Sequence, residues 1–216
     1  IGHVRKRMKE PVTWFEFVTA MAFLHFAREH IDIAVLEVGM GGRLDATNVT
    51  EPVVSVISNV SLEHQAYLGN RLSQIAGEKG EIIRRGRPCI TAAKQPQVVR
   101  VLEELCRERQ APLYRLGKDF HVRKNPDGTF HYRGLNRTYP RLVCPLYGRH
   151  QYANAGVALA VVEALTEQGY NISDEAIEEG LKETRWEGRL EALGHEPMVL
   201  LDGAHNPAGI AALCRT

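Results

Sequence analysis

The sequence predicts an α/β protein with a mainly parallel sheet and helices on both faces, followed by the start of a second α/β domain. Short apolar runs rich in β-branched residues alternate with segments of helical spacing up to about residue 118. A new strand–turn–helix pattern then begins near residue 197. We therefore divide the chain into a first unit, 1–186, and the beginning of a second, 187–216, with the boundary near Trp186–Gly188.

The first unit opens with a helix that begins at Pro11 and is apolar nearly all round, so we expect it to pack against a sheet. The run IDIAVLEV, residues 31–38, is continuously apolar and predicts a strand buried on both faces. Further strands are expected at 53–60, 87–92 and 111–116, and helices at 71–86 and 95–110.

Residues 119–144 differ, because an Asn-Pro-Asp-Gly turn separates polar, alternating segments and predicts an antiparallel hairpin or small meander. A long helix that ends at Gly169 and a shorter one capped by Ser173 follow. In the second unit an apolar strand leads through a turn to a helix with Asn206 as its N-cap and Pro207 at its first position. RWEGRLE is taken as a link between the units.

The composition is that of an ordinary soluble domain, with 44% apolar and 25% charged residues and a formal net charge of +1. Such a balance gives no field that draws the chain to nucleic acid or to a membrane, and the basic runs RGRP and HVRK are interpreted as solvated surface. Four scattered cysteines without a CxxC pair favour free, buried thiols in a reducing cytoplasm. The first residue is not Met and the last helix has barely begun, so we interpret the chain as a fragment.

The stretch VLEVGMGGRLDATNV places three glycines in four positions directly after an apolar run. The dinucleotide fingerprint fails because its third glycine position holds Leu44. A methyltransferase-like loop fails at Arg43 and at Asn59, which stands where an acid should end the next strand. A Gly-Lys-Ser/Thr triplet for binding a triphosphate occurs nowhere in the chain.

An acidic residue and an imidazole follow two of the expected strands. Glu37 ends the first apolar run, and His64 follows the second, so both face the edge where parallel sheets bind ligands if the strands are adjacent. A carboxylate and an imidazole suit a magnesium ion that takes its other ligands from phosphates and water. In the alternative reading, which the residues alone leave open, Glu37 caps a helix and His64 is a surface residue.

Six segments, in this order, are similar to the folylpolyglutamate synthase / dihydrofolate synthase family of Mur-type ligases. They are FEFVTAMAFLHFA with IDIAVLEVGMGGRLDATNV, SNVSLEHQAYLG, GEKGEIIR, GRHQYANAGVAL, RWEGRLE and LLDGAHNPAG. The resemblance implies a Mur ligase-type central ATPase domain and the beginning of a C-terminal ligase domain. It also implies an ATP-dependent ligase that adds L-glutamate to a folate or dihydropteroate carboxylate through an acyl phosphate.

The resemblance implies Mg²⁺ with ATP as co-substrate, and a cytoplasmic, monomeric enzyme. Glu37 and His64 resemble the family's metal ligands, and Lys79 resembles its carbamylated lysine. Leu44 and Asp45 fall in the segment near the pterin and glutamate substrates, and Asp45 is also implied in catalysis.

The ATP-binding residues implied by the resemblance are Asn154, Arg189 and Asp202, with His205 beside them as a further catalytic candidate. One departure from the family pattern is Gly80-Glu81, where Ala-Gly is usual, and it suggests an extra negative charge close to the metal. We expect the glycines after Glu37 to let backbone approach the metal and substrate.

Two other functions stay open at this point. One is a non-catalytic remnant that binds folate or a partner, and the other is a methyltransferase that uses S-adenosylmethionine. Because no segment can wrap the β and γ phosphates, we expect the fragment alone to be inactive as a ligase.

Overall fold

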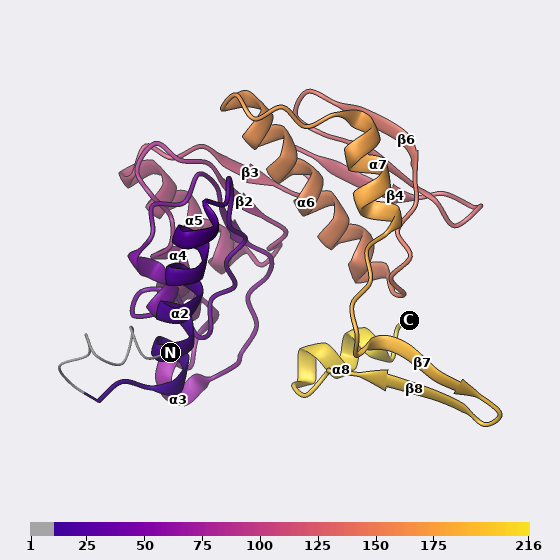
Figure 1. The fold of residues 1–216 in the computed structure, drawn as a ribbon, viewed down its shortest axis with the longest axis horizontal. Helices are drawn as coiled ribbons and strands as arrows, with labels where there is room; N and C mark the ends of the chain where they lie inside the picture. Colours follow the sequence, from indigo (N-terminus) through magenta and orange to yellow (C-terminus); the bar gives the residue numbers. More distant parts are fainter. Residues whose placement is uncertain (1–10) are drawn as a thin grey trace.

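A computed structural model describes residues 11–216 of the protein, and its first unit is built on a parallel sheet. The sheet contains β1 (Ser55–Ile57), β2 (Cys89–Thr91) and β3 (Leu113–Arg115), in that order. Helices α4 (Leu72–Gly80) and α5 (Pro96–Glu108) connect successive strands (Figure 1). All three strands are parallel, so their carboxyl ends meet at one edge of the sheet.

Neighbouring residues of β2 face opposite layers, as the period of a strand requires. Cys89 packs into a core shared with α4 and α5. Ile90 packs into a second core, formed with α6 (Arg149–Glu167) and α7 (Asp174–Lys182). Helices therefore cover both faces of the parallel sheet, and the predicted fold class is confirmed.

The predicted strand at 31–38 is wrong. The segment has no regular secondary structure, and Val35 is 96% exposed. A strand exists only with a hydrogen-bonded neighbour, and β1 pairs with β2 alone among the described strands. The apolar run therefore indicates that the segment is suited to a sheet, but it does not supply the partner.

The first helix, α2 (Trp14–Glu29), starts later than expected, because Thr13 and Glu16 form a capping box. The expectation that α2 packs against a sheet is also wrong for the described residues. The helix contacts the short 3₁₀ helix η1 (Ala46–Val49), and Trp14 is 77% exposed. Its apolar surface has no sheet to cover, because residues 31–38 form none.

The polar segment after β3 forms the predicted antiparallel meander, made of β4 (His121–Lys124), β5 (Phe130–Arg133) and β6 (Thr138–Leu142). Phe130 and Tyr132 point into the core against α6. The cap of α7 is as predicted, since the Ser173 hydroxyl accepts a hydrogen bond from the Ala176 amide.

The chain ends with β7 (Arg189–His195), β8 (Met198–Asp202) and α8 (Pro207–Leu213), drawn in yellow in Figure 1. Asn206 caps α8 as predicted, but RWEGRLE is not only a link, because β7 pairs antiparallel with β8. Within the described residues, neither apolar core includes a residue after Leu181. A domain boundary near 186–188 stays a prediction.

The four cysteines are free, as predicted. Cys89 and Cys106 are buried, but Cys144 is half-buried and Cys214 is exposed, so burial does not hold for all four.

Candidate active site

The glycine loop is held in shape by the carboxylate of Asp45. One oxygen accepts hydrogen bonds from the amides of Gly39 and Met40, both at 2.9 Å. The other accepts from the amide of Thr47 at 2.9 Å and from its hydroxyl at 2.6 Å. Four donors occupy the acceptor sites of this carboxylate, so Asp45 fixes the loop that follows Glu37. Its predicted part in catalysis or substrate binding stays a prediction.

The glycines themselves pack against protein. A Cβ at Gly39 would lie 2.7 Å from the ring of Phe15. Gly41 has a φ of +68°, which favours glycine. A Cβ at Gly42 would lie 2.6 Å from the Glu78 carbonyl oxygen and 2.9 Å from that of Lys79. Protein atoms thus occupy the side-chain direction of Gly39 and Gly42, and the expectation that the glycines open the backbone to a metal or substrate stays a prediction.

Two arginines fasten the same loop to α4 and to the segment that follows it. The Arg43 side chain donates from Nε to both carboxylate oxygens of Glu78, each at 3.1 Å, and its amide donates to the Glu78 carbonyl at 3.0 Å. Arg84 donates to the carbonyl and to the side-chain oxygen of Asn48, at 2.7 and 2.8 Å. The glycine loop thus lies directly on the last turn of the helix that carries Lys79.

Lys79 forms an ion pair that the sequence reading missed. Its ammonium lies 3.0 Å from the carboxylate of Glu63, and the two side chains are only 22% and 26% exposed. Glu63 immediately precedes His64, so the pair joins the segment after β1 to the end of α4. A carboxylate next to a candidate imidazole was the available signal for this residue.

The carboxylates next to Lys79 in sequence are paired with arginines, and the predicted negative charge close to the metal stays a prediction. The Glu81 carboxylate lies 2.8 Å from the Arg109 guanidinium, and Glu78 is paired with Arg43. A Cβ at Gly80 would lie 2.3 Å from a methyl group of Leu105, so close helix packing occupies that position. Gly80 and Glu81, which stand where the family usually has Ala-Gly, thus both make contacts within the protein.

Glu37 and His64 are both exposed, and neither side chain makes a hydrogen bond or ion pair with the residues that the structure describes. His64 has left-handed backbone angles, φ 49° and ψ 37°, and begins the short helix α3 (Gln65–Leu68). Within residues 11–216 no group of three or more His, Cys, Asp or Glu side chains is arranged to hold a metal. The Glu37–His64 site has only two protein ligands, so this finding does not test it and the site stays a prediction. Leu44 is 82% exposed.

The residues predicted to bind ATP lie on two elements. Arg189 and Asp202 stand opposite each other in the β7–β8 register. The Asp202 carboxylate accepts from the amides of Leu190 and Ala204, at 3.0 and 2.9 Å, and thereby ties the start of β7 to the turn before α8. His205 is exposed in that turn, with Nδ1 2.8 Å from the Gly203 carbonyl oxygen.

Asn154 lies on α6, where its amide nitrogen donates to Gln151 at 3.0 Å. The C-terminal end of the chain approaches the start of the same helix, because a Cβ at Gly148 would lie 3.0 Å from the Thr216 hydroxyl. The elements that carry Asn154 and His205 are therefore neighbours at this end of α6. No distance joins them to Glu37 or Lys79.

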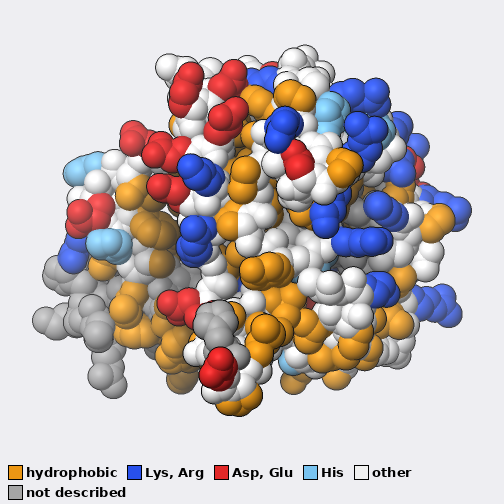
Figure 2. Space-filling view, turned by 90° about the vertical axis from the view of Figure 1, so that its right-hand side faces the viewer, with side chains coloured by type: hydrophobic (Ala, Val, Ile, Leu, Met, Phe, Trp, Pro, Cys, Tyr) orange, Lys and Arg blue, Asp and Glu red, His pale blue; other side chains and the backbone are white. Residues whose placement is uncertain are grey.

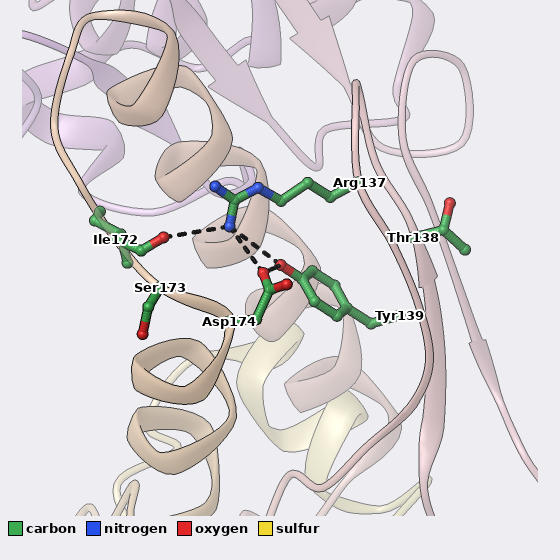
Figure 3. A pocket seen from close by; sticks show the side chains of 6 residues that line it. All are labelled: Arg137, Thr138, Tyr139, Ile172, Ser173 and Asp174. Carbon is green, nitrogen blue, oxygen red and sulfur yellow. Dashed lines mark hydrogen bonds and ion pairs between the residues drawn. The ribbon is translucent and has the colours of Figure 1, made fainter.

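Two hollows lie on the surface. One, of about 440 Å³, adjoins the glycine loop and is bordered by Arg43, Tyr67, Gly77 and Glu78 among others. The other, of about 490 Å³, lies between β6 and α7 (Figure 3). There Arg137 donates to Tyr139 and Asp174, so the polar groups satisfy one another and join the helix to the meander.

The sequence matches the Mur ligase middle domain family over residues 7–162. The chain belongs to the Mur ligase family. Among curated relatives of this Mur ligase chain, the dihydrofolate synthase/folylpolyglutamate synthase of Bacillus subtilis is 39% identical. The match covers 94% of this chain and 49% of the Bacillus subtilis protein. The chain spans about half the length of the curated relatives it matches.

Solved structures agree with that assignment. A complex of FPGS with AMPPCP and folate has a TM-score of 0.91 at 34% identity, covering 98% of this chain and 53% of its own. The folylpolyglutamate synthase of Thermotoga maritima has a TM-score of 0.85 at 41% identity, covering 99% and 49%. The predicted resemblance to the folylpolyglutamate synthase / dihydrofolate synthase family is thus confirmed. Among the described helices, none combines the length and apolar character needed to cross a bilayer.

Proposed function

We propose that this Mur ligase chain takes part in the ATP-dependent addition of L-glutamate to a folate or dihydropteroate carboxylate. The similarity to dihydrofolate synthase/folylpolyglutamate synthases, and to an FPGS that binds AMPPCP and folate, supports this reaction. The same similarity gives no support to the methyltransferase alternative.

The observation that carries the proposal is the meeting of three separately predicted segments. Gly42 and Arg43 of the glycine loop contact the turn that contains Glu78 and Lys79. Lys79 in turn contacts Glu63, next to His64. Residues 37–45, 63–64 and 79 therefore form one connected unit, as a site that controls charge around a carboxylate and a triphosphate requires.

Within this unit Glu37 and His64 would hold Mg²⁺. Their side chains make no bonds with described residues, and a carboxylate oxygen with an imidazole nitrogen is an acceptable partial ligand set. When bound, the ion would offset repulsion between the substrate carboxylate and the phosphates. Lys79, at the same end of α4, would carry the carbamate that the family resemblance implies.

Asn154, Arg189, Asp202 and His205 would contact ATP from the start of α6 and the base of the β7–β8 hairpin. The two peptide hydrogen bonds of Asp202 position this turn, and they leave the Arg189 side chain exposed for a phosphate. We also propose that the chain consists of two units, 1–186 and 187–216. We further propose that the protein is a cytoplasmic monomer. The free cysteines agree with a reducing compartment.

The test uses a protein with the full length of the curated relatives, because the chain alone is expected to be inactive. It measures glutamate-dependent release of phosphate from ATP, with folate and dihydropteroate as separate substrates. Glu37→Ala and His64→Ala should each reduce turnover by at least about a hundredfold, because each removes a ligand that acts on transition-state charge. Both side chains are exposed, so the thermal midpoint without ligand should not change.

Matched controls are available in the same region. His30 is also an exposed histidine with left-handed backbone angles, and Glu29 is exposed at the end of α2. His30→Ala and Glu29→Ala should retain turnover. If Glu37→Ala and His64→Ala also retain it, the metal assignment is wrong. Folate binding without any turnover in the unaltered protein of full length would favour the non-catalytic alternative.

A further inference from the structure

The outer face of the antiparallel meander carries basic side chains in register. In β4 and β5, His121 stands opposite Arg133, and Arg123 stands opposite His131. Both arginines are exposed and both histidines are half-buried. The Arg133 guanidinium lies 3.2 Å from Nδ1 of His121.

One further cation extends this face, because Arg141 on β6 is 72% exposed. Lys124 ends β4 on the opposite side, that of the core-packed Val122, and its ammonium lies over the Tyr152 ring of α6. Arg141 pairs with Asp127 at 2.6 Å, but Lys124 has no carboxylate partner among the described residues. Residues 119–144 contain five Lys or Arg and two Asp, whereas the whole chain has a net charge of only +1. We call the set of His121, Arg123, His131, Arg133 and Arg141 the basic face.

This arrangement lacks the cross-strand ion pairs that stabilise a sheet. Opposite charges directly across strands stabilise a sheet, and like charges destabilise it. No carboxylate stands opposite Arg123 or Arg133 in the meander, where Arg133 faces His121 on one side and Thr138 on the other. In Figure 2 the basic side chains gather toward the upper right of the molecule, while the acidic ones lie mostly to the left. A sheet face built in this way is suited to an anionic ligand rather than to stability.

The basic face leads toward the candidate ATP residues. At its hairpin tip the Tyr152 hydroxyl donates to the Gly128 carbonyl at 3.2 Å, and the Lys124 ammonium lies 5.9 Å from the centre of the Tyr152 ring. Tyr152 and Asn154 lie two residues apart on α6. The hairpin tip is therefore held beside the end of α6 that carries Asn154, a proposed ATP-binding residue.

We propose that the basic face binds the oligo-γ-glutamyl chain of an elongated folate. This inference rests on the proposed function, in which each added glutamate leaves one more carboxylate on the product. Successive side chains on one face of a strand repeat about every 7 Å. A γ-linked glutamate, with two backbone carbons more than an α-linked residue, repeats about every 6 Å when extended. The donors of the face and the carboxylates of the chain thus have similar spacings.

RNA is the less suitable ligand of similar charge. Proteins that bind single strands combine cations with aromatic rings on which bases stack. In the meander the aromatic rings of Phe130, Tyr132 and Tyr139 are buried toward α6, so the outer face offers cations without a stacking platform.

The experiment measures binding of dye-labelled penta-γ-L-glutamate to the purified protein by fluorescence anisotropy, without ATP. The double variant Arg123→Gln/Arg133→Gln should bind the pentamer roughly tenfold more weakly, because it removes two charge–charge attractions. Its thermal midpoint should change little, since both arginines are exposed and neither pairs with a carboxylate among the described residues. Arg100→Gln/Arg107→Gln, which removes two exposed arginines of α5, should bind as the unaltered protein does.

The proposal is overturned if the pentamer binds no more tightly than free glutamate, or if the double variant binds it normally. Tighter binding of a single-stranded RNA with the same number of charges would overturn the choice of ligand. Ligation of a substrate with one glutamate should be unchanged in the double variant, whereas KM for a pentaglutamyl substrate should rise. Ligation is measured in a protein with the full length of the curated relatives, and its failure there, with pentamer binding intact, would count against the proposed function alone.

Discussion

The Lys79 ammonium lies 3.0 Å from the Glu63 carboxylate, although the two residues are sixteen positions apart and on different elements. The pair is mostly shielded from solvent and directs the lysine toward the segment of His64. Gly42 contacts the carbonyl oxygens of Glu78 and Lys79 on the same turn. The orientation of Lys79 is therefore fixed from two directions, by Glu63 at its side chain and by the glycine loop at its backbone.

We predict that Glu63→Gln lowers kcat by roughly tenfold with little change in KM for ATP, because Glu63 acts by positioning Lys79. The double variant Glu63→Gln/Lys79→Ala should lose no more activity than Lys79→Ala alone, since the effects of coupled residues are not additive. Steady-state kinetics of the three variants measure both effects.

The control for this prediction is Glu103→Gln, which breaks a comparable ion pair, 2.8 Å from Arg115. Both substitutions should change the free energy of unfolding by at most about 1 kcal/mol, as is usual for partly exposed pairs. Additive losses in the Glu63→Gln/Lys79→Ala variant would show that Glu63 does not act through Lys79.

A second prediction concerns the contact between the glycine loop and α4. Gly42→Ala should lower the free energy of unfolding by about 1–3 kcal/mol, because the new methyl group overlaps two backbone carbonyls that cannot move aside. Gly77→Ala is the matched control on the same helix. A Cβ there meets nothing within 4 Å, so helix propensity should raise stability by roughly 0.5–1 kcal/mol.

Denaturant titrations of the two glycine variants measure this difference. Equal stabilities would show that the loop moves away from α4 without cost. Activity provides a second readout, since Gly42→Ala should also reduce turnover by displacing the turn of Lys79, whereas Gly77→Ala should not.

The sequence was sufficient to predict most local structure in the first unit. Apolar runs located the three parallel strands, and Ser173 and Asn206 marked the starts of two helices as N-caps. It failed where a strand depends on its neighbour. Residues 31–38 have the apolar pattern but no partner, and β7 is polar but pairs with β8.

The environment of Lys79 shows why a site is harder to predict than a strand. Glu78 and Glu81 are near Lys79 in sequence, but residues one or two positions apart on a helix do not face each other. The two carboxylates pair with Arg43 and Arg109, from the glycine loop and the end of α5. Only the fold brings Glu63 to Lys79, so spacing along the chain could not identify the partner.

A third prediction concerns pH and the buried pair of Tyr132 and Glu163 in the second core. The fully buried Tyr132 hydroxyl donates to the Glu163 carboxylate at 2.7 Å. Burial is the largest cause, and this hydrogen bond the next, that raises the pKa of Tyr132 well above its ordinary value of about 10. The other oxygen of Glu163 accepts from the Asn136 and Arg137 amides, so the pair joins α6 to the turn between β5 and β6.

Because the folded-state pKa of Tyr132 is the higher one, its contribution to stability is complete below about pH 10, where the phenol is neutral in both states. Above that pH the unfolded chain loses the phenolic proton while the folded protein keeps it. Stability should then fall by up to about 1.4 kcal/mol per pH unit for this residue. Tyr139 and Tyr114, whose pKa values burial also raises, add to the same alkaline loss.

Tyr132→Phe should therefore have two opposite effects. At neutral pH it leaves a buried Glu163 oxygen without its hydrogen bond, which should cost about 1–3 kcal/mol. Above pH 10 it removes one titrating group, so its stability should decline less steeply than that of the unaltered protein. Tyr147→Phe, at a residue that is 68% exposed, should change neither quantity. Denaturant unfolding at intervals from pH 7 to about pH 11 measures the stability at neutral pH and its decline above pH 10. If stability falls with pH equally in Tyr132→Phe and in the unaltered protein, the phenol ionises equally in the folded and unfolded states.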